Sequence, residues 1–187
     1  MFILASSSPR RQELLKKVVP HFITISPTIN EDILVPEHEY LPYELSKLKA
    51  YAIFATHPHD TILASDTIVL FKNQVLGKPK DKEDAKRMLR LLSGNMHYVV
   101  TAYTLISPHF EINRQVITRV YFHHLDEKFI HDYVEMGSPL DKAGAYGIQD
   151  QDFPCVSKIV GSHDNVMGLP TEDLAKALAK CAQTKTS

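Results

Sequence analysis

A run of Ile, Leu and Val between residues 61 and 70 predicts a β-strand buried inside the fold. Asp66 lies in the middle of this run, although burying an ionised carboxylate costs free energy unless the group is paired or binds a metal. Residues 72–74 then predict a hairpin turn before a short strand at residues 75–77. The strand can accommodate Asp66 in one of two ways, as half of a structural salt bridge or as part of a functional site.

Strands and helices follow one another along the rest of the chain. Their patterns predict strands at 2–4, 21–25, 96–106, 112–122 and 156–160, and helices at 11–19, 43–55, 82–92, 126–136 and 172–182. The early strands alternate with helices whereas the middle ones form hairpins, which predicts an α/β fold of mixed α+β character with a mixed sheet flanked by helices. No internal repeat or linker is recognisable, so we expect a single domain over residues 1–187.

The charge balance argues against a general nucleic-acid binder. The chain has 21 basic and 22 acidic side chains and a net charge of -1, so no long-range positive field gathers DNA or RNA from solution. The sequence turns polar directly after Ala5, which predicts neither a signal peptide nor a membrane span. Cys155 and Cys181 have no metal-binding spacing and suggest no disulfide framework. We therefore expect a cytoplasmic protein.

The serine-rich turn after the first predicted strand contains the groups that typically bind phosphate. Ser6, Ser7 and Ser8 precede a predicted helix and are followed by Arg10 and Arg11. Unpaired N–H groups and the dipole at a helix N-terminus favour an anion, and arginine forks match phosphate oxygens. The alternative is a simple N-cap with two solvated arginines, and this segment alone favours neither.

Further polar residues indicate a binding site only when they are considered as a group. Lys78 follows a glycine that permits close backbone approach, whereas Lys49 in a helix is indistinguishable from a surface lysine. The pair Glu31-Asp32 is either solvated acid or the source of a second metal ligand. One buried carboxylate with several cations on loops suggests a metal ion and a polyphosphate bound together.

The segment 141–149 predicts a loop with a specified backbone path, because Gly144 and Gly147 lie three residues apart in a chain with few glycines. The loop ends at Gln149, whose amide offers a donor and an acceptor that complement the N3–H and O4 edge shared by uracil and thymine. The alternative role of this amide is to satisfy backbone groups of the loop.

Several enzyme classes lose support because their motifs are missing. The ten histidines show no HExxH or other metal-ligand spacing, and no GxSxG, P-loop or Rossmann glycine motif is present. Serine hydrolases, P-loop enzymes and dinucleotide-dependent enzymes are therefore disfavoured.

The order of the motifs resembles the Maf family of nucleotide pyrophosphatases from end to end. The matching segments are residues 5–11, Glu31, Lys49-Ala50, Asp66-Thr67, residues 77–79, residues 92–94 with His97 and Thr101, residues 141–149, and residues 161–170. The resemblance implies a fold with a cleft between two lobes, similar to that of the inosine-triphosphate pyrophosphatases, and a homodimer. It also implies hydrolysis of a nucleoside triphosphate between the α and β phosphates, which would keep non-standard nucleotides from being incorporated.

The resemblance also assigns roles to individual residues. Asp66 matches the catalytic aspartate of the family, as general base or as metal ligand. The other matching cleft residues are Ser8, Arg11, Lys49 and Lys78 for the triphosphate, and Glu31, which with Asp66 would hold a divalent metal ion, Mg²⁺ or Mn²⁺.

Three positions divide the family by the base it accepts, and here they are Arg10, Thr67 and Gln149. They resemble the dTTP/UTP branch, whereas the 7-methyl-GTP branch tends to carry tryptophan, glutamine and glutamate. A 7-methyl-GTP pyrophosphatase is thus the alternative enzyme. A non-enzymatic regulator of septum formation is the alternative outside enzymes, and a buried Asp66 among cationic loops argues against it.

Overall fold

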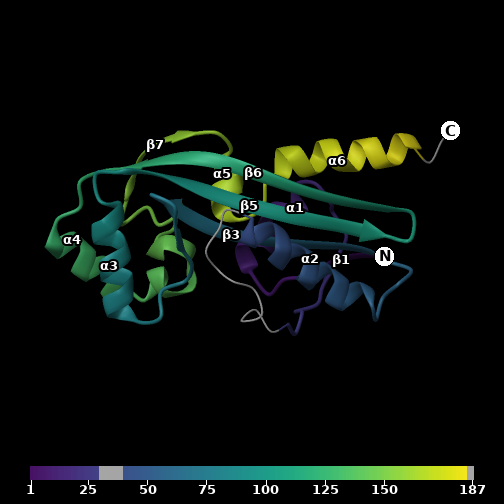
Figure 1. The fold of residues 1–187 in the computed structure, drawn as a ribbon, viewed down its shortest axis with the longest axis horizontal. Helices are drawn as coiled ribbons and strands as arrows, with labels where there is room; N and C mark the ends of the chain where they lie inside the picture. Colours follow the sequence, from purple (N-terminus) through teal and green to yellow (C-terminus); the bar gives the residue numbers. More distant parts are fainter. Residues whose placement is uncertain (30–39, 185–187) are drawn as a thin grey trace.

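The computed structural model of the chain describes residues 1–29 and 40–184. Its centre is a seven-stranded sheet of order β2-β1-β3-β5-β6-β7, with β4 paired to β3 (Figure 1). The strands are β1 (Phe2–Leu4), β2 (Ile23–Thr24), β3 (Thr61–Phe71), β4 (Gln74–Leu76), β5 (Met96–Ser107), β6 (Phe110–Phe122) and β7 (Val156–Val160). The helices are α1 (Pro9–Lys16), α2 (Leu41–Phe54), α3 (Lys82–Leu92), α4 (Glu127–Glu135), α5 (His163–Met167) and α6 (Thr171–Thr184), with 3-10 turns η2 (Ser138–Asp141) and η3 (Ala143–Ala145).

The sheet is mixed, as the alternation of helices and hairpins predicts. β1 pairs in parallel with β2 and β3, while β3–β5, β5–β6 and β6–β7 pair antiparallel. α1 and α2 provide the long crossovers that parallel neighbours require. Of the antiparallel pairs, β5 and β6 are joined by a short turn, whereas longer segments that include α3 and α4 connect β3 to β5 and β6 to β7. The expected α/β fold with a mixed sheet flanked by helices is confirmed.

Helices cover both faces of the first half of the sheet, which we call the first lobe. Ile62 of β3 packs with Ile53 of α2 on one face, and Leu63 packs with Leu15 of α1 and Leu174 of α6 on the other. The alternation follows from the strand geometry, in which successive side chains point to opposite faces. β3 is therefore buried on both sides.

A second core lies at the other end of the long strands and defines the second lobe. Leu89 of α3 and Ile130 and Tyr133 of α4 pack there against Val120 of β6. Figure 1 shows α3 and α4 gathered at this end, away from α2 and α6. Because β3, β5 and β6 contribute to both cores, the lobes share one sheet.

Most predicted elements are present with small shifts at their ends. The predicted helix 82–92 and strand 156–160 match α3 and β7 to the residue. The hairpin turn after β3 is confirmed, with Lys72 and Asn73 both at positive φ, 47° and 63°, as a two-residue hairpin requires. The five-residue helix α5 was not predicted, because it is too short to show a helical period.

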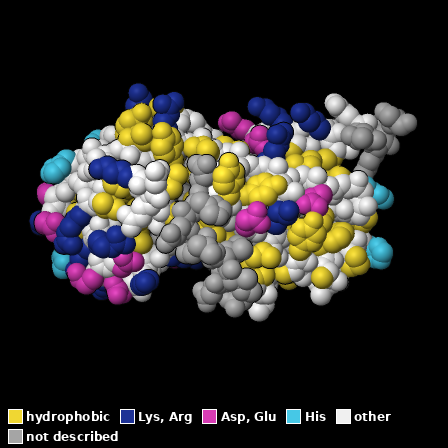
Figure 2. All heavy atoms as spheres, viewed as in Figure 1, with side chains coloured by type: hydrophobic (Ala, Val, Ile, Leu, Met, Phe, Trp, Pro, Cys, Tyr) yellow, Lys and Arg dark blue, Asp and Glu magenta, His cyan; other side chains and the backbone are white. Residues whose placement is uncertain are grey.

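No helix in residues 1–29 and 40–184 is long and apolar enough to cross a membrane. On the face shown in Figure 2, basic and acidic side chains are interspersed rather than gathered into one basic surface.

Candidate active site

A cleft of about 1010 Å³ lies between the two lobes. Its walls are the turn after β1, the middle of β3, the β3–β4 hairpin, and the loop that follows η2. The cleft brings together, from distant parts of the chain, Ser8, Arg10, Arg11, Lys49, Asp66, Thr67, Lys78 and Gln149. All the predicted site residues within the described part of the chain line it, and Glu31 lies outside that part.

The serine turn begins helix α1 and leaves backbone donors available. The Ser8 hydroxyl caps the helix by accepting from the Arg11 N–H at 3.5 Å, and the Ser6 hydroxyl accepts from the Ser8 N–H at 3.2 Å. The N–H groups of Ser7 and Arg10 have no acceptor among the described residues. The N-cap is thus present, but the two arginines are not merely solvated, since Arg10 pairs with Asp141 and Arg11 donates to other groups of the protein. The same turn still offers N–H groups to an anion at the helix N-terminus.

Asp66 projects from β3 toward α2, on the same face as Ile62 and Ile68. The Lys49 ammonium of α2 donates to Asp66 Oδ1 at 2.6 Å, and the two side chains are 12% and 13% exposed. The structural salt bridge considered for Asp66 therefore exists, and it lies in the cleft. A carboxylate held on one oxygen can still accept a proton or bind a cation through the other.

Thr67 points to the opposite face of β3 and anchors Arg11. The Thr67 and Thr101 hydroxyl oxygens are 3.0 Å apart, and Thr101 donates to the carbonyl of Asn165 at 2.8 Å. Because each hydroxyl has one proton, Thr67 donates to Thr101 and its oxygen accepts from Arg11 Nη2 at 3.2 Å. Arg11 Nε donates to the carbonyl of Gly168 at 2.9 Å, so the guanidinium is held at two points.

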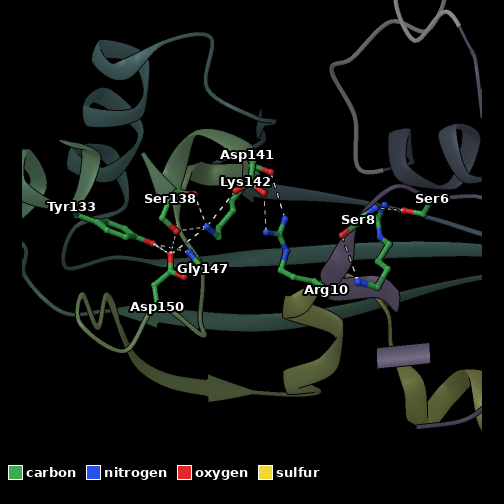
Figure 3. A network of polar contacts seen from close by, with 10 residues as sticks. Ser6, Ser8, Arg10, Tyr133, Ser138, Asp141, Lys142, Gly147 and Asp150 are labelled. Atoms are coloured by element: carbon green, nitrogen blue, oxygen red, sulfur yellow. Dashed lines mark hydrogen bonds and ion pairs between the residues drawn. The ribbon is translucent and has the colours of Figure 1, made fainter. Parts of the chain in front are cut away.

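The loop of residues 141–149 forms the opposite wall. Arg10 Nη1 donates to Asp141 Oδ2 at 3.0 Å, an ion pair between the two walls (Figure 3). Although burial opposes ionisation, the charges of Arg10 and Lys142 hold the pKa of Asp141 below its usual range. The carboxamide of Gln149 has no hydrogen-bond partner among the described residues and lines the cleft. Its amide is therefore available to a ligand rather than to the loop backbone.

Close packing behind this wall fixes its path. Gly144 has φ +69°, and a Cβ there would lie 2.8 Å from Val69 Cγ2, so this position requires glycine. The Tyr146 hydroxyl is 2.8 Å from Nε2 of His97, which is 1% exposed. Burial lowers the pKa of His97 to about 3, which keeps the ring neutral at pH 7.

Positive charge dominates the cleft although the whole chain has a net charge of -1. Among the described lining residues the acidic ones are Asp66 and Asp141, and the basic ones are Arg10, Arg11, Lys49, Lys72, Lys78 and Lys142. This local excess favours a polyanion of small size, since the surrounding low-dielectric walls strengthen its attraction.

The carboxylates of the cleft limit the way in which it could hold a divalent metal ion. Residues 1–29 and 40–184 contain no cluster of three or more His, Cys, Asp or Glu side chains. Mg²⁺ is usually held in nucleotide sites by one or two carboxylates, waters and the substrate phosphates. The second oxygen of Asp66 beside a cationic phosphate site fits that mode, and it does not fit a cage made of protein ligands alone.

Some residues of the site show no local sign of their role, although Thr101 and Asn165 lie in segments that resemble the family. Thr101 and Asn165 complete the anchor of Arg11, but a threonine within a strand and an asparagine in a short helix resemble ordinary structural residues. In the sequence Asp141 stands out only as the start of a glycine-containing loop, because its pairing with Arg10 spans 131 residues. Such long-range partners are set by the fold, not by local spacing.

Comparison with known proteins connects this geometry to a family. The family described as Maf-like protein matches residues 1–181. The dTTP/UTP pyrophosphatase of Akkermansia muciniphila is 42% identical over 179 residues, covering 94% of each chain. That of Carboxydothermus hydrogenoformans is 41% identical over 177 residues, covering 94% of this chain and 95% of the relative. That of Thermococcus onnurineus is 38% identical over 172 residues, covering 92% and 93%.

A solved structure supports the fold. The Staphylococcus aureus Ham1 protein superposes with a TM-score of 0.56 at 14% identity, covering 97% of this chain and 98% of that chain. At this identity the similarity concerns the fold alone, and it confirms the fold class expected from the motif order.

Proposed function

The chain belongs to the Maf family, and we propose that it is a nucleoside triphosphate pyrophosphatase that converts dTTP and UTP to the monophosphate and pyrophosphate. The names of relatives at 38–43% identity over most of the chain support this activity. The observation that carries the proposal is the position of Asp66, a buried carboxylate in a cleft with a positive excess, between a serine turn and an unpartnered amide.

The two walls suggest how the nucleotide lies. The serine turn with Arg11 and Lys49 would bind the phosphates, with Lys78 adding charge from the second lobe's side of the cleft. The base would then reach Gln149, where N3–H and O4 of uracil or thymine meet an acceptor and a donor. Arg10 and Thr67 remain predicted specificity residues, and both line this cleft.

Asp66 is proposed to act as the general base. A water molecule attacks the α phosphorus, its proton passes to the free oxygen of Asp66, and the bond between the α phosphorus and the bridging oxygen breaks. Lys49 orients the carboxylate through the other oxygen, and the cationic side chains neutralise the charge that develops on the departing pyrophosphate. Positioning and charge neutralisation therefore supply most of the catalysis.

A divalent metal ion, Mg²⁺ or Mn²⁺, is part of the proposal. Asp66 would hold it together with substrate phosphates and with Glu31, which lies outside the described residues. Bound there, it would neutralise phosphate oxygens and lower the pKa of water. A role for Asp66 as metal ligand and a role as base share the same free oxygen, so removing the carboxylate abolishes both.

We also propose a cytoplasmic homodimer that keeps non-standard nucleotides out of nucleic acid. The two free cysteines, Cys155 and Cys181, suit a reducing compartment. The homodimer is implied by the family resemblance, and sedimentation equilibrium tests it.

The test is hydrolysis of a nucleotide panel in Mg²⁺ or Mn²⁺, with phosphate detected after added pyrophosphatase. We expect turnover of dTTP and UTP, and a loss of about 10²-fold or more in kcat for Asp66→Asn. Asp60→Asn is the control, because Asp60 is also ion-paired, with the N-terminal amine at 2.7 Å, but lies outside the cleft lining.

Each outcome distinguishes the candidates. Preference for 7-methyl-GTP would replace the substrate and keep the chemistry. Near-normal turnover by Asp66→Asn would remove the assigned role of Asp66. Absence of turnover with every nucleotide would favour the non-enzymatic regulator.

A further inference from the structure

A network of charged groups centred on the buried Lys142 lies within the wall that carries Gln149. The Lys142 side chain is 8% exposed, and its ammonium donates to the carbonyl of Ser138 and to the Ser138 hydroxyl at 2.6 Å. It also lies 3.4 Å from Asp150 Oδ2 and 3.3 Å from Asp141 Oδ1. Figure 3 shows these side chains converging from both ends of the loop. The loop is thus closed upon a buried cation.

Tyr133 of α4 connects this network to the loop backbone. Its hydroxyl donates to Asp150 Oδ2 at 2.5 Å and accepts from the N–H of Gly147 at 2.9 Å. Tyr133 is fully buried, and burial, followed by the hydrogen bond to Asp150, raises the pKa of its hydroxyl. The group therefore stays protonated and can serve as donor and acceptor at once.

Gly147 lies in contact with both this network and the side chain of Gln149. A Cβ on Gly147 would lie 2.7 Å from Lys142 Cε, 2.8 Å from Asp150 Oδ2 and 2.8 Å from Gln149 Nε2. The Gln149 carboxamide consequently packs against the backbone of Gly147. The N–H of the same glycine donates to the Tyr133 hydroxyl. Neither Tyr133 nor Asp150 is among the residues that line the cleft.

We infer that Tyr133 and Asp150 are positioning residues that set base selectivity by fixing the loop backbone at Gly147, against which the Gln149 carboxamide packs. The inference rests on the proposed function. A carboxamide turned over by 180° presents its donor and acceptor in the order that cytosine requires, because cytosine has an acceptor at N3 and a donor at N4. Discrimination between uracil and cytosine thus depends on how firmly the amide is held.

The geometry predicts which kinetic quantity changes. Asp66 lies on β3 and is held by Lys49 of the first lobe, whereas the network belongs to α4, η2 and the loop of the second lobe. Loosening the network should therefore raise KM for UTP and narrow the ratio of kcat/KM between UTP and CTP, while kcat for UTP changes little.

The experiment compares Tyr133→Phe with Tyr103→Phe. Tyr103 is equally buried and also donates to a carboxylate, Asp173 Oδ1 at 2.6 Å, but it packs in the first-lobe core away from the loop. Both variants lose one hydroxyl from a buried tyrosine, so they are matched in chemistry. UTP and CTP share sugar and phosphates, so their ratio isolates the base.

In Tyr133→Phe we expect the UTP-to-CTP ratio of kcat/KM to fall roughly tenfold. Amide hydrogen exchange of the peptide covering residues 144–149 should also quicken, because Gly147 loses its acceptor. In Tyr103→Phe both quantities should equal those of the wild type. Asp150→Asn keeps the shape of Asp150 but removes its charge, and it should narrow the ratio even if Tyr133→Phe folds poorly.

A ratio in both Tyr133→Phe and Asp150→Asn equal to that of Tyr103→Phe would overturn the inference and leave the proposed function intact. Faster exchange in the loop without a change in the ratio would likewise overturn it, since the loop would then move without affecting base choice. Absence of nucleotide hydrolysis by the wild type would overturn the proposed function, and the inference with it.

Discussion

At the scale of single residues, two explanations of Asp66 hold together. The sequence offers a salt bridge or a functional site, and the structure has Asp66 paired with Lys49 on the floor of a positively charged cleft. The sequence could not reveal this partner, because a lysine in a helix has no local mark of burial. Strand alternation explains the geometry, since Asp66 faces α2 while Thr67 faces α1.

Gln149→Glu should reduce kcat/KM for UTP by about 10²-fold, because the new carboxylate lacks the N–H that pairs with O4 and repels that oxygen. Gln151→Glu adds the same charge two residues away at an exposed position outside the cleft lining. We expect it to leave UTP hydrolysis close to that of the wild type. Equal kinetics for the two variants, measured side by side on UTP, would speak against base recognition by Gln149.

His97 should make the stability of the protein depend on pH. Its pKa of about 3 in the folded state lies below the 6.5 of a free histidine, so protonation favours the unfolded state. Stability from this residue is present above pH 6.5 and is lost as the pH falls toward 3. Between pH 7 and pH 5 the loss should be about 2 kcal/mol. The free energy of unfolding of His97→Gln, measured in urea, should lack this share of the pH dependence. If it changed with pH as steeply as that of the wild type, the depressed pKa of His97 would be contradicted.

At the scale of elements, the sequence predicts regular segments better than the loops that build the site. The helical spacing of apolar residues predicts the amphipathic helix α3, and two long apolar runs separated by turn residues predict the hairpin β5–β6. The loop between η2 and β7 does not, because its path depends on contacts of Gly144 with Val69 and of Tyr146 with His97. Those partners are far apart in the chain, and only the packed fold brings them together.

Gly144→Ala should destabilise the protein more than Gly137→Ala. Both glycines have positive φ, +69° and +78°, but a Cβ at Gly144 meets Val69 Cγ2 at 2.8 Å whereas nothing lies within 4 Å at Gly137. The backbone strain common to both is about 1 kcal/mol, and the steric overlap should add about 1–3 kcal/mol at Gly144. Urea unfolding measures both, and Val69→Ala should recover part of the loss at Gly144. Equal losses in the two variants would exclude the overlap.

At the scale of the whole molecule, two cores share three strands. Leu89 packs in the second lobe and Leu15 in the first, and β3, β5 and β6 run through both. The mixed sheet could be predicted from the alternation of elements, whereas the division into lobes came from the family resemblance and not from any linker in the chain. A shared sheet leaves no linker to detect, and it suggests that the lobes fold as one unit.

Unfolding should therefore be a single transition. Leu15→Ala and Leu89→Ala each remove a fully buried side chain and should each cost about 2–5 kcal/mol. Both should displace the same transition, followed by circular dichroism and by tyrosine fluorescence, since the chain has no tryptophan. Two separate transitions, or a shift seen by one probe only, would show that the lobes are independent domains.

The anchor of Arg11 has a consequence for the history of the chain. Thr67 uses its one proton toward Thr101 and its oxygen toward Arg11, so a replacement at this position alters a guanidinium as well as its own surroundings. One mutation at position 67 thus changes two things at once, the residue that lines the cleft and the hydrogen bond that anchors Arg11. Lineages that exchange this threonine are expected to carry compensating changes at positions 11 or 101, and such covariation records a constraint that no single residue displays.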